Sequence, residues 1–208
     1  FKKTVDHLLK GNNAAVKLDG SNLGIKVIDG PNGKEFAADR ASTGEIDIQG
    51  ITARNVQKRF AKGHGLTNTV LKTLKIFNAA LPSIKKELQQ LGMWDDPTVY
   101  FNCEYVEEGE DEEGKRTAAN VVEYGENFIA IHSINQTYEK TNQRTGAYRP
   151  GIVRPKGIDG KPISAFAVEI PFKKSVLNSV IRKIKQVSMQ DEYGNFNMYH
   201  EIPSSLSK

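Results

Sequence analysis

Residues 14–39 form short strand-like runs of apolar and polar residues that are separated by turn residues. Residues 14–18 and 23–28 are two such runs, with a turn predicted at 19–22 between them. A second turn at 29–34 precedes a third run at 35–39. Alternation with a period of two is typical of strands with one buried face, and Asp-Gly pairs favour tight turns. The pattern therefore predicts strands joined by hairpin turns.

Helical periodicity replaces this alternation at 51–91 and again at 175–187, where apolar residues recur every three or four positions. Pro82 is expected to begin a helix, because its missing N–H is no loss in the first turn. Ser175 is the expected N-cap of the later helix. A short helix is also predicted at residues 4–10. The later helix should bury Val176, Val180, Ile184 and Val187.

Strand-like residues return at 99–106, and two further runs, 121–124 and 128–134, surround a turn. Residues 139–164 are polar and rich in turn residues. This order of hairpins, helices, strands and a final helix predicts an α+β fold with a largely antiparallel sheet.

Composition indicates a globular chain with enough apolar material for a core: of 208 residues, 38% are hydrophobic and 26% are charged. No run of about 18 uncharged apolar residues occurs, so no membrane partner is expected. The single cysteine, Cys103, suits a reducing compartment and a place in the core. Because the chain begins with Phe1, we expect it to have been processed or cut from a longer protein.

The charges are segregated along the chain. Residues 51–90 contain eight Lys or Arg and one acid, and residues 171–186 contain five bases and no acid. Such regions can hold nucleic-acid phosphates, although solvated helix faces explain them equally well. The candidate nucleic-acid contacts are Arg54, Lys58, Arg59 and Lys62.

The strongest candidate for chemistry is the tetrad Lys17-Leu18-Asp19-Gly20. A lysine at the end of a buried strand can lose its proton and become a nucleophile, and Asp19 points to the same face of an extended chain. Gly20 permits close approach of the backbone to a ligand. The alternative is a hairpin turn with a surface lysine.

Two later residues extend this candidate site. Arg40 ends the run at 35–39 and could bind a phosphate or a ribose. Glu104 interrupts the apolar run 99–106, where an ionised carboxylate needs a partner such as a metal, a ribose hydroxyl or a lysine. The alternative is an edge strand whose Glu104 faces water.

These residues, in this order, resemble the nucleotidyltransferase domain of ATP-dependent RNA and DNA ligases, most closely the ligase-like proteins of tailed bacteriophages. The tetrad matches the lysine motif, while Arg40 and Glu104 fit the next two motifs. The run 128–134 resembles the strand that packs on adenine, with Ile131 at the stacking position and His132 beside it. The likeness implies a core at 1–135 with a basic helical insert at 51–91, and a family-specific extension or insert at 136–208 with its helix.

The resemblance implies that Lys17 attacks the α-phosphorus of ATP and forms lysyl-AMP, which then passes to a nucleic-acid end for ligation or repair. Glu104 would hold a ribose or Mg²⁺, and Arg40 a ribose or phosphate. The expected location is the cytoplasm of an infected bacterium. The expected nucleotide contacts are Val16, Asp19, Gly20, Ser21, Arg40, Glu104, Ile131 and His132.

Three departures from the family pattern keep a second hypothesis open. Ile131 stands where an aromatic residue is usual, the Glu-Gly-x-Val strand is replaced by Pro150-Gly151-Ile152-Val153, and the terminal Lys-x-Lys is missing. We expect the last two motifs to lie in chain that is not present, or to have been lost. The alternative function is a catalytically inactive ligase-like module that binds nucleotide or nucleic acid, or serves in phage structure or assembly.

Overall fold

The structure of this protein is a computed structural model. It describes residues 18, 20–39, 49–60, 64–109, 123–140, 148–150 and 165–202. The short helix expected at residues 4–10 lies outside these ranges.

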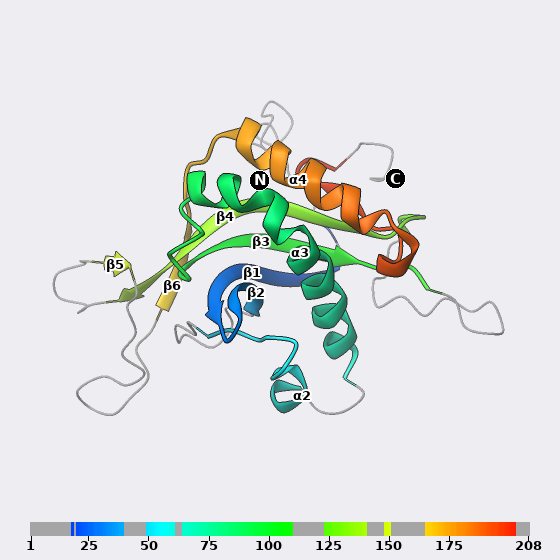
Figure 1. Ribbon diagram of the computed structural model, residues 1–208, viewed down its shortest axis with the longest axis horizontal. Coiled ribbons are helices and arrows are strands. Elements are labelled where there is room, and N and C mark those ends of the chain that lie inside the picture. Colours follow the sequence, from blue (N-terminus) through cyan, green and yellow to red (C-terminus); the bar gives the residue numbers. More distant parts are fainter. Residues whose placement is uncertain are drawn as a thin grey trace, which may run out of the picture.

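The described residues form a curled sheet of seven strands, in the order β2-β1-β3-β4-β5, with β6 and β7 also paired to β4 (Figure 1). Every pairing is antiparallel except that of β7 with β4. The prediction of an α+β fold with a largely antiparallel sheet is confirmed. The strands are β1 (Ser21–Gly30), β2 (Gly33–Asp39), β3 (Val99–Val106), β4 (Phe128–Lys140), β5 (Tyr148–Pro150), β6 (Ala165–Glu169) and β7 (Asn197–Tyr199).

The hairpin between β1 and β2 turns where the sequence predicts it. Gly30 pairs with Gly33, and Gly33 has a φ of +115°, a backbone conformation open mainly to glycine. The prediction of a turn at 19–22 is wrong for Ser21 and Asn22, which already belong to β1, and Asp19 lies outside the described residues. Ser21 and Asn22 belong to β1 because β3 extends past the hairpin and pairs with both, Tyr105 with Ser21 and Glu104 with Asn22.

Two long helices, α3 (Gly65–Gln90) and α4 (Lys174–Ser188), lie against one another and cover one face of the sheet (Figure 1). The short helix α2 (Val56–Arg59) precedes α3, and a 3-10 turn, η1 (Asp191–Tyr193), follows α4. None of the helices in the described ranges is both long and apolar enough to cross a bilayer.

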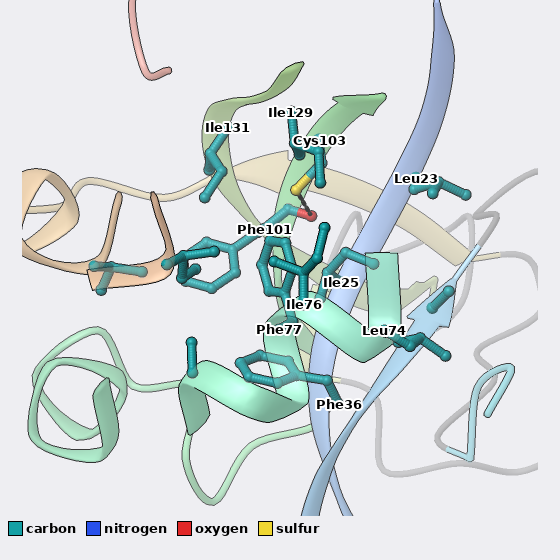
Figure 2. Packing of buried hydrophobic residues seen from close by; sticks show 14 of the residues in the cluster. Leu23, Ile25, Phe36, Leu74, Ile76, Phe77, Phe101, Cys103, Ile129 and Ile131 are labelled. Atoms are coloured by element: carbon teal, nitrogen blue, oxygen red, sulfur yellow. Dashed lines mark hydrogen bonds between the residues drawn. The ribbon is translucent and has the colours of Figure 1, made fainter. Parts of the chain in front are cut away.

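The main hydrophobic core lies between this face and the two helices. Phe77 of α3 contacts Phe36 of β2 edge to face, with ring centroids 5.4 Å apart, and lies 6.2 Å from the ring of Phe101 (Figure 2). Cys103 is buried among these side chains, as the sequence predicts, and its burial raises the pKa of its thiol far above the usual range. Cys103 is therefore a structural residue.

The prediction that Pro82 begins a helix is wrong, because Pro82 lies inside α3. An interior proline removes one helical hydrogen bond and costs about 3 kcal/mol. Buried residues on both sides of it hold the helix together, since each large apolar side chain contributes about 1.5–3 kcal/mol. They are Phe77, Leu81, Ile84 and Leu88. Figure 1 shows that α3 changes direction along its length, as prolines commonly cause.

The helix predicted at 175–187 exists, with two corrections. Its N-cap is Lys173 and Ser175 lies within its first turn, because the helix begins one residue earlier. The buried stripe is also rotated: Val180 and Ile184 are buried as predicted, while Val176 and Val187 are half-buried. Leu177 and Ile181 are buried beside them, because α4 packs on α3 as well as on the sheet.

The described part of the expected extension belongs to the same layers as the rest. The boundary expected at residue 135 falls within β4. Leu177, Phe196 and Met198 contribute to the main core beside residues of β1 and α3.

The contact between α3 and α4 includes a buried carboxylate. Glu87 Oε1 accepts hydrogen bonds from Ser179 Oγ at 2.8 Å and from Lys183 Nζ at 2.6 Å. Burial raises the pKa of Glu87, but these hydrogen bonds outweigh it, so the pKa lies below its ordinary value. The ionised form therefore stabilises the fold above the pKa of an unfolded glutamate, and this contribution is lost as the pH falls through the folded-state pKa.

We expect Pro82→Ala to stabilise the protein by about 1–3 kcal/mol, because the exposed Pro82 restricts the interior of a helix. Urea unfolding measures the change, and the exposed Ala79→Gly, expected to cost about 1 kcal/mol, calibrates it. Destabilisation by Pro82→Ala would mean that the bend in α3 is required for its packing.

We expect Glu87→Gln to lower the free energy of unfolding at pH 7 by about 1–3 kcal/mol. The difference from wild type should shrink as the pH falls through the folded-state pKa of Glu87, which lies below that of an ordinary glutamate. Urea titrations at several pH values measure this. Glu201→Gln is the control, since Glu201 forms an exposed ion pair with Lys174 and should change stability little. A stability difference between wild type and Glu87→Gln that does not change with pH would contradict the conclusion that the ionised Glu87 stabilises the fold.

Candidate functional site

The face of the sheet opposite α3 and α4 carries polar side chains at its centre. Strand residues alternate between faces, and Leu23, Ile25, Phe101 and Cys103 belong to the main core. Their neighbours in the strands therefore point to the other face. These are Asn22 and Lys26 of β1, and Tyr100, Asn102 and Glu104 of β3. Ser133 and Asn135 of β4 join them, opposite Asn102 and Tyr100.

Glu104 lies near the middle of this polar face. Its strand, β3, is flanked by β1 and β4, and the residue is only 9% exposed. The alternative of an edge strand with Glu104 facing water is therefore wrong. Its Oε1 accepts a hydrogen bond from the backbone N–H of Gly20 at 3.1 Å. A buried carboxylate needs such donors, since an unsatisfied charge is costly to bury.

Gly20 approaches β3 more closely than any other residue type could. A Cβ at this position would lie 2.7 Å from the carbonyl oxygen of Tyr105 and 3.0 Å from Cγ of Glu104. The glycine of the tetrad is thus required by packing against the candidate site, as well as by any ligand.

Leu18, the second residue of the tetrad, is anchored on the same side of the sheet. It is 7% exposed and belongs to a second cluster, separate from the main core. The second cluster consists of Leu18, Val106, Tyr124, Phe128 and Ala130. Ala130 is the β4 partner of Glu104, so the cluster adjoins the carboxylate. Both described residues of the tetrad therefore contact the surroundings of Glu104.

Four of the expected nucleotide-site residues lie outside the described residues: Val16, Lys17, Asp19 and Arg40. Arg40 directly follows Asp39, which ends β2. Ser21 is half-buried in β1, opposite Tyr105.

A buried ion pair on this face received no role in the sequence analysis. Lys26 Nζ lies 3.0 Å from Asp39 Oδ2, and the lysine side chain is 2% exposed. Gly50, with a φ of +60°, crosses over it, since a Cβ there would lie 2.9 Å from Cε of Lys26. Tyr100 is buried beside Lys26, and burial raises the pKa of its phenol, with the charge of Asp39 contributing. The feature of the sequence that could have indicated this ion pair is a lysine within the otherwise apolar run 23–28.

The structure separates the two residues expected to pack on adenine. Ile131 is fully buried in the main core, on the face opposite Glu104, because its β3 partner is Cys103. Ile131, the expected adenine-stacking residue, therefore does not share a face of the sheet with Glu104. His132 falls at a β-bulge, where Asn102 pairs with Ser133 and Cys103 with Ile131. It is half-buried, and burial, together with nearby His200, lowers its pKa.

Several described basic residues of the region 51–90 contact other groups of the protein. Arg54 forms an ion pair with Glu35, while Lys58 and Arg59 are exposed at the end of α2. Lys62 lies outside the described residues. In α3, Lys72 pairs with Glu107, and Lys75 and Lys85 lie over the rings of Tyr193 and Trp94. The charge at 51–90 is thus partly neutralised by the protein's own groups.

The side chains of this polar face suit a metal ion that is already bound to substrate phosphates better than a metal ion that the protein alone would hold. The described ranges contain no group of three or more His, Cys, Asp or Glu side chains placed to hold an ion. Mg²⁺ in phosphoryl-transfer sites is commonly held by one or two carboxylates together with substrate phosphates. Glu104 is a carboxylate suited to that part, and Asp39 is already paired with Lys26.

We expect Gly20→Ala to destabilise the protein by about 1–3 kcal/mol, because the added Cβ meets backbone and would displace the chain from Glu104. Gly65→Ala is the matched control: nothing lies within 4 Å of its Cβ position, and alanine in a helix is favourable by up to about 1 kcal/mol. Urea unfolding compares the two variants. Equal stability of both variants would contradict the close approach at Gly20.

Comparison with protein-family models, curated proteins and solved structures finds no match for this chain.

Proposed function

We propose that this protein is an ATP-dependent nucleotidyltransferase that forms lysyl-AMP on Lys17 and transfers the AMP to nucleic-acid ends for joining or repair. The observation that carries the proposal is the hydrogen bond from Gly20 N–H to the buried carboxylate of Glu104. It links two motifs that are 84 positions apart in sequence.

The proposed first step is an in-line displacement at phosphorus. The neutral amine of Lys17 attacks the α-phosphorus of ATP, and a P–N bond forms as the bond to the β-phosphate oxygen breaks. Pyrophosphate leaves, and the amine proton passes to solvent. Such reactions depend mainly on positioning and on stabilisation of charge. Mg²⁺ would offset phosphate charge, with Glu104 as the candidate protein ligand.

The proposed second step transfers AMP to a nucleic-acid 5′-phosphate. An oxygen of that phosphate attacks the AMP phosphorus, the P–N bond breaks, and Lys17 regains its amine. A 3′-hydroxyl then attacks the activated 5′-phosphate, and AMP leaves as the phosphodiester forms. The exposed Lys58 and Arg59, with Arg54 and Lys62, are the candidate contacts to the acceptor's backbone.

One observation favours the second candidate function, a binding module without catalysis. Ile131, at the expected adenine-stacking position, is fully buried on the opposite face of the sheet. A chain that lacks the base platform could keep the tetrad for its packing role at Gly20 and Leu18 alone.

The distinguishing experiment is intact-mass analysis after incubation with ATP and Mg²⁺. We expect wild type to gain the mass of AMP, and Lys17→Ala to gain nothing. Glu104→Gln should slow adduct formation by about 10²-fold or more, as expected for a group that stabilises charge in the transition state. Lys173→Ala, an exposed residue at the start of α4, is the matched control and should behave as wild type.

An adduct that persists in Lys17→Ala would show that another residue is the nucleophile. A folded wild-type chain that gains no mass would overturn the proposal that this chain forms lysyl-AMP by itself, and would favour the binding module.

A further inference from the structure

The chain returns to the candidate site after α4. Strand β7 pairs in parallel with the beginning of β4, and its Tyr199 lies opposite Ala130. Ala130 in turn lies opposite Glu104, and Glu104 opposite Asn22. Paired residues share a face, so Tyr199 and Glu104 lie on the same face with one small side chain between them. At about 4.8 Å per strand, their backbones are roughly 10 Å apart.

Polar contacts fix β7 in this place. Glu126, in the turn before β4, accepts two hydrogen bonds of 2.6 Å. One carboxylate oxygen accepts from Tyr199 Oη and the other from Asn197 Nδ2. Burial and the bond to Glu126 raise the pKa of the Tyr199 phenol, so it remains a donor at neutral pH. One residue later, His200 Nδ1 lies 2.9 Å from the carbonyl oxygen of Ile131.

The same segment closes the second cluster around Leu18. The ring of Tyr199 meets that of Phe128 edge to face at 5.7 Å, and Phe128 meets Tyr124 at 5.3 Å. Tyr199 and Ile202 are the partly buried residues that pack against the cluster. Leu18, buried in it, is the covalent neighbour of both Lys17 and Asp19.

We propose that residues 197–202 form a C-terminal clamp that holds Leu18 in the second cluster and thereby sets the reactivity of Lys17. In this arrangement Tyr199 is a positioning residue, because it acts through Phe128 and Leu18. The part of the proposal that concerns Lys17 rests on the proposed function, whereas the anchoring of Leu18 and Gly20 does not.

The part of the clamp from Tyr199 onward can open without unfolding the rest of the protein, while Met198 keeps β7 in the main core. The second cluster is small and separate from the main core, and its C-terminal wall is held by a three-residue strand and the bonds to Glu126. Units with few buried contacts open locally at lower free energy than the whole domain. Loss of the clamp should therefore affect the tetrad before it affects α3 or the central strands.

The test is amide hydrogen exchange of the full chain, followed residue by residue by NMR, in wild type, Tyr199→Ala and Tyr199→Phe. The reporter is the Gly20 amide, which donates to Glu104. We expect Tyr199→Ala to reduce its protection by about tenfold or more, with amides of α3 unchanged. Tyr199→Phe keeps the ring and loses only the bond to Glu126, so it should have a smaller effect. Tyr193→Ala is the control, since Tyr193 packs against the main core beneath Lys75.

A second readout measures the rate of lysyl-AMP formation against ATP concentration in the same variants. We expect Tyr199→Ala to slow adduct formation at saturating ATP, and Tyr199→Phe to restore most of the rate. Unchanged Gly20 protection in folded Tyr199→Ala would overturn the clamp. If Tyr199→Ala does not fold, Ile202→Ala replaces it and is judged by the same criterion.

The experiments can overturn the proposed function and the clamp independently of one another. Absence of an adduct in wild type overturns the proposed function, while exchange at Gly20 still decides whether the clamp exists. An adduct whose rate is insensitive to Tyr199→Ala, with Gly20 deprotected, would overturn the link from the clamp to Lys17.

Discussion

Once α3 covers one face of the sheet, the period of two along each strand decides which side chains meet on the other face. Leu23 and Ile25 must face the helix, so Asn22 and Lys26 cannot. The same holds for Glu104, which stands between two core residues, Cys103 and Tyr105. The polar surface is thus a consequence of where the apolar residues are needed. The pairing of β1 with β3 places the polar residues of the two strands next to one another.

That surface has an energetic cost, which the structure meets with specific partners. A buried charge is tolerated only when paired or hydrogen-bonded. Lys26 has Asp39 at 3.0 Å, and Glu104 has the Gly20 amide at 3.1 Å. Replacing such groups with apolar residues of similar volume often stabilises proteins, so the stability of the fold alone does not explain two buried ionisable residues on one face. The sheet keeps this chemistry on a rigid support, because β1 and β3 are central strands.

The sequence predicts the elements better than it predicts their partners. The strand-like residues at 99–106 identify β3 with its observed bounds, and the turn at 29–34 identifies the β1–β2 hairpin. Pro82 misleads because local propensity is weaker than the burial of Phe77, Leu81 and Ile84 around it. Ile131 misleads because a motif gives a position along a strand but not the face it presents. The contact of Tyr199 with the cluster of Leu18 cannot be predicted from local sequence patterns. The two residues are 181 positions apart in sequence, and the β4–β7 pairing brings them together.

The bulge at His132 divides β4 into two halves of opposite phase. Before it, odd-numbered Ile129 and Ile131 face the helices; after it, even-numbered Ile134 does. One extra residue therefore acts as a parity correction that keeps Ser133 and Asn135 on the polar side. Deletion of this residue would remove the bulge and leave Ser133 opposite Asn102, whereas a strand in which His132 joined the pairing would exchange the two faces for its whole second half. What the second half of β4 requires of this position is that it stays outside the pairing with β3.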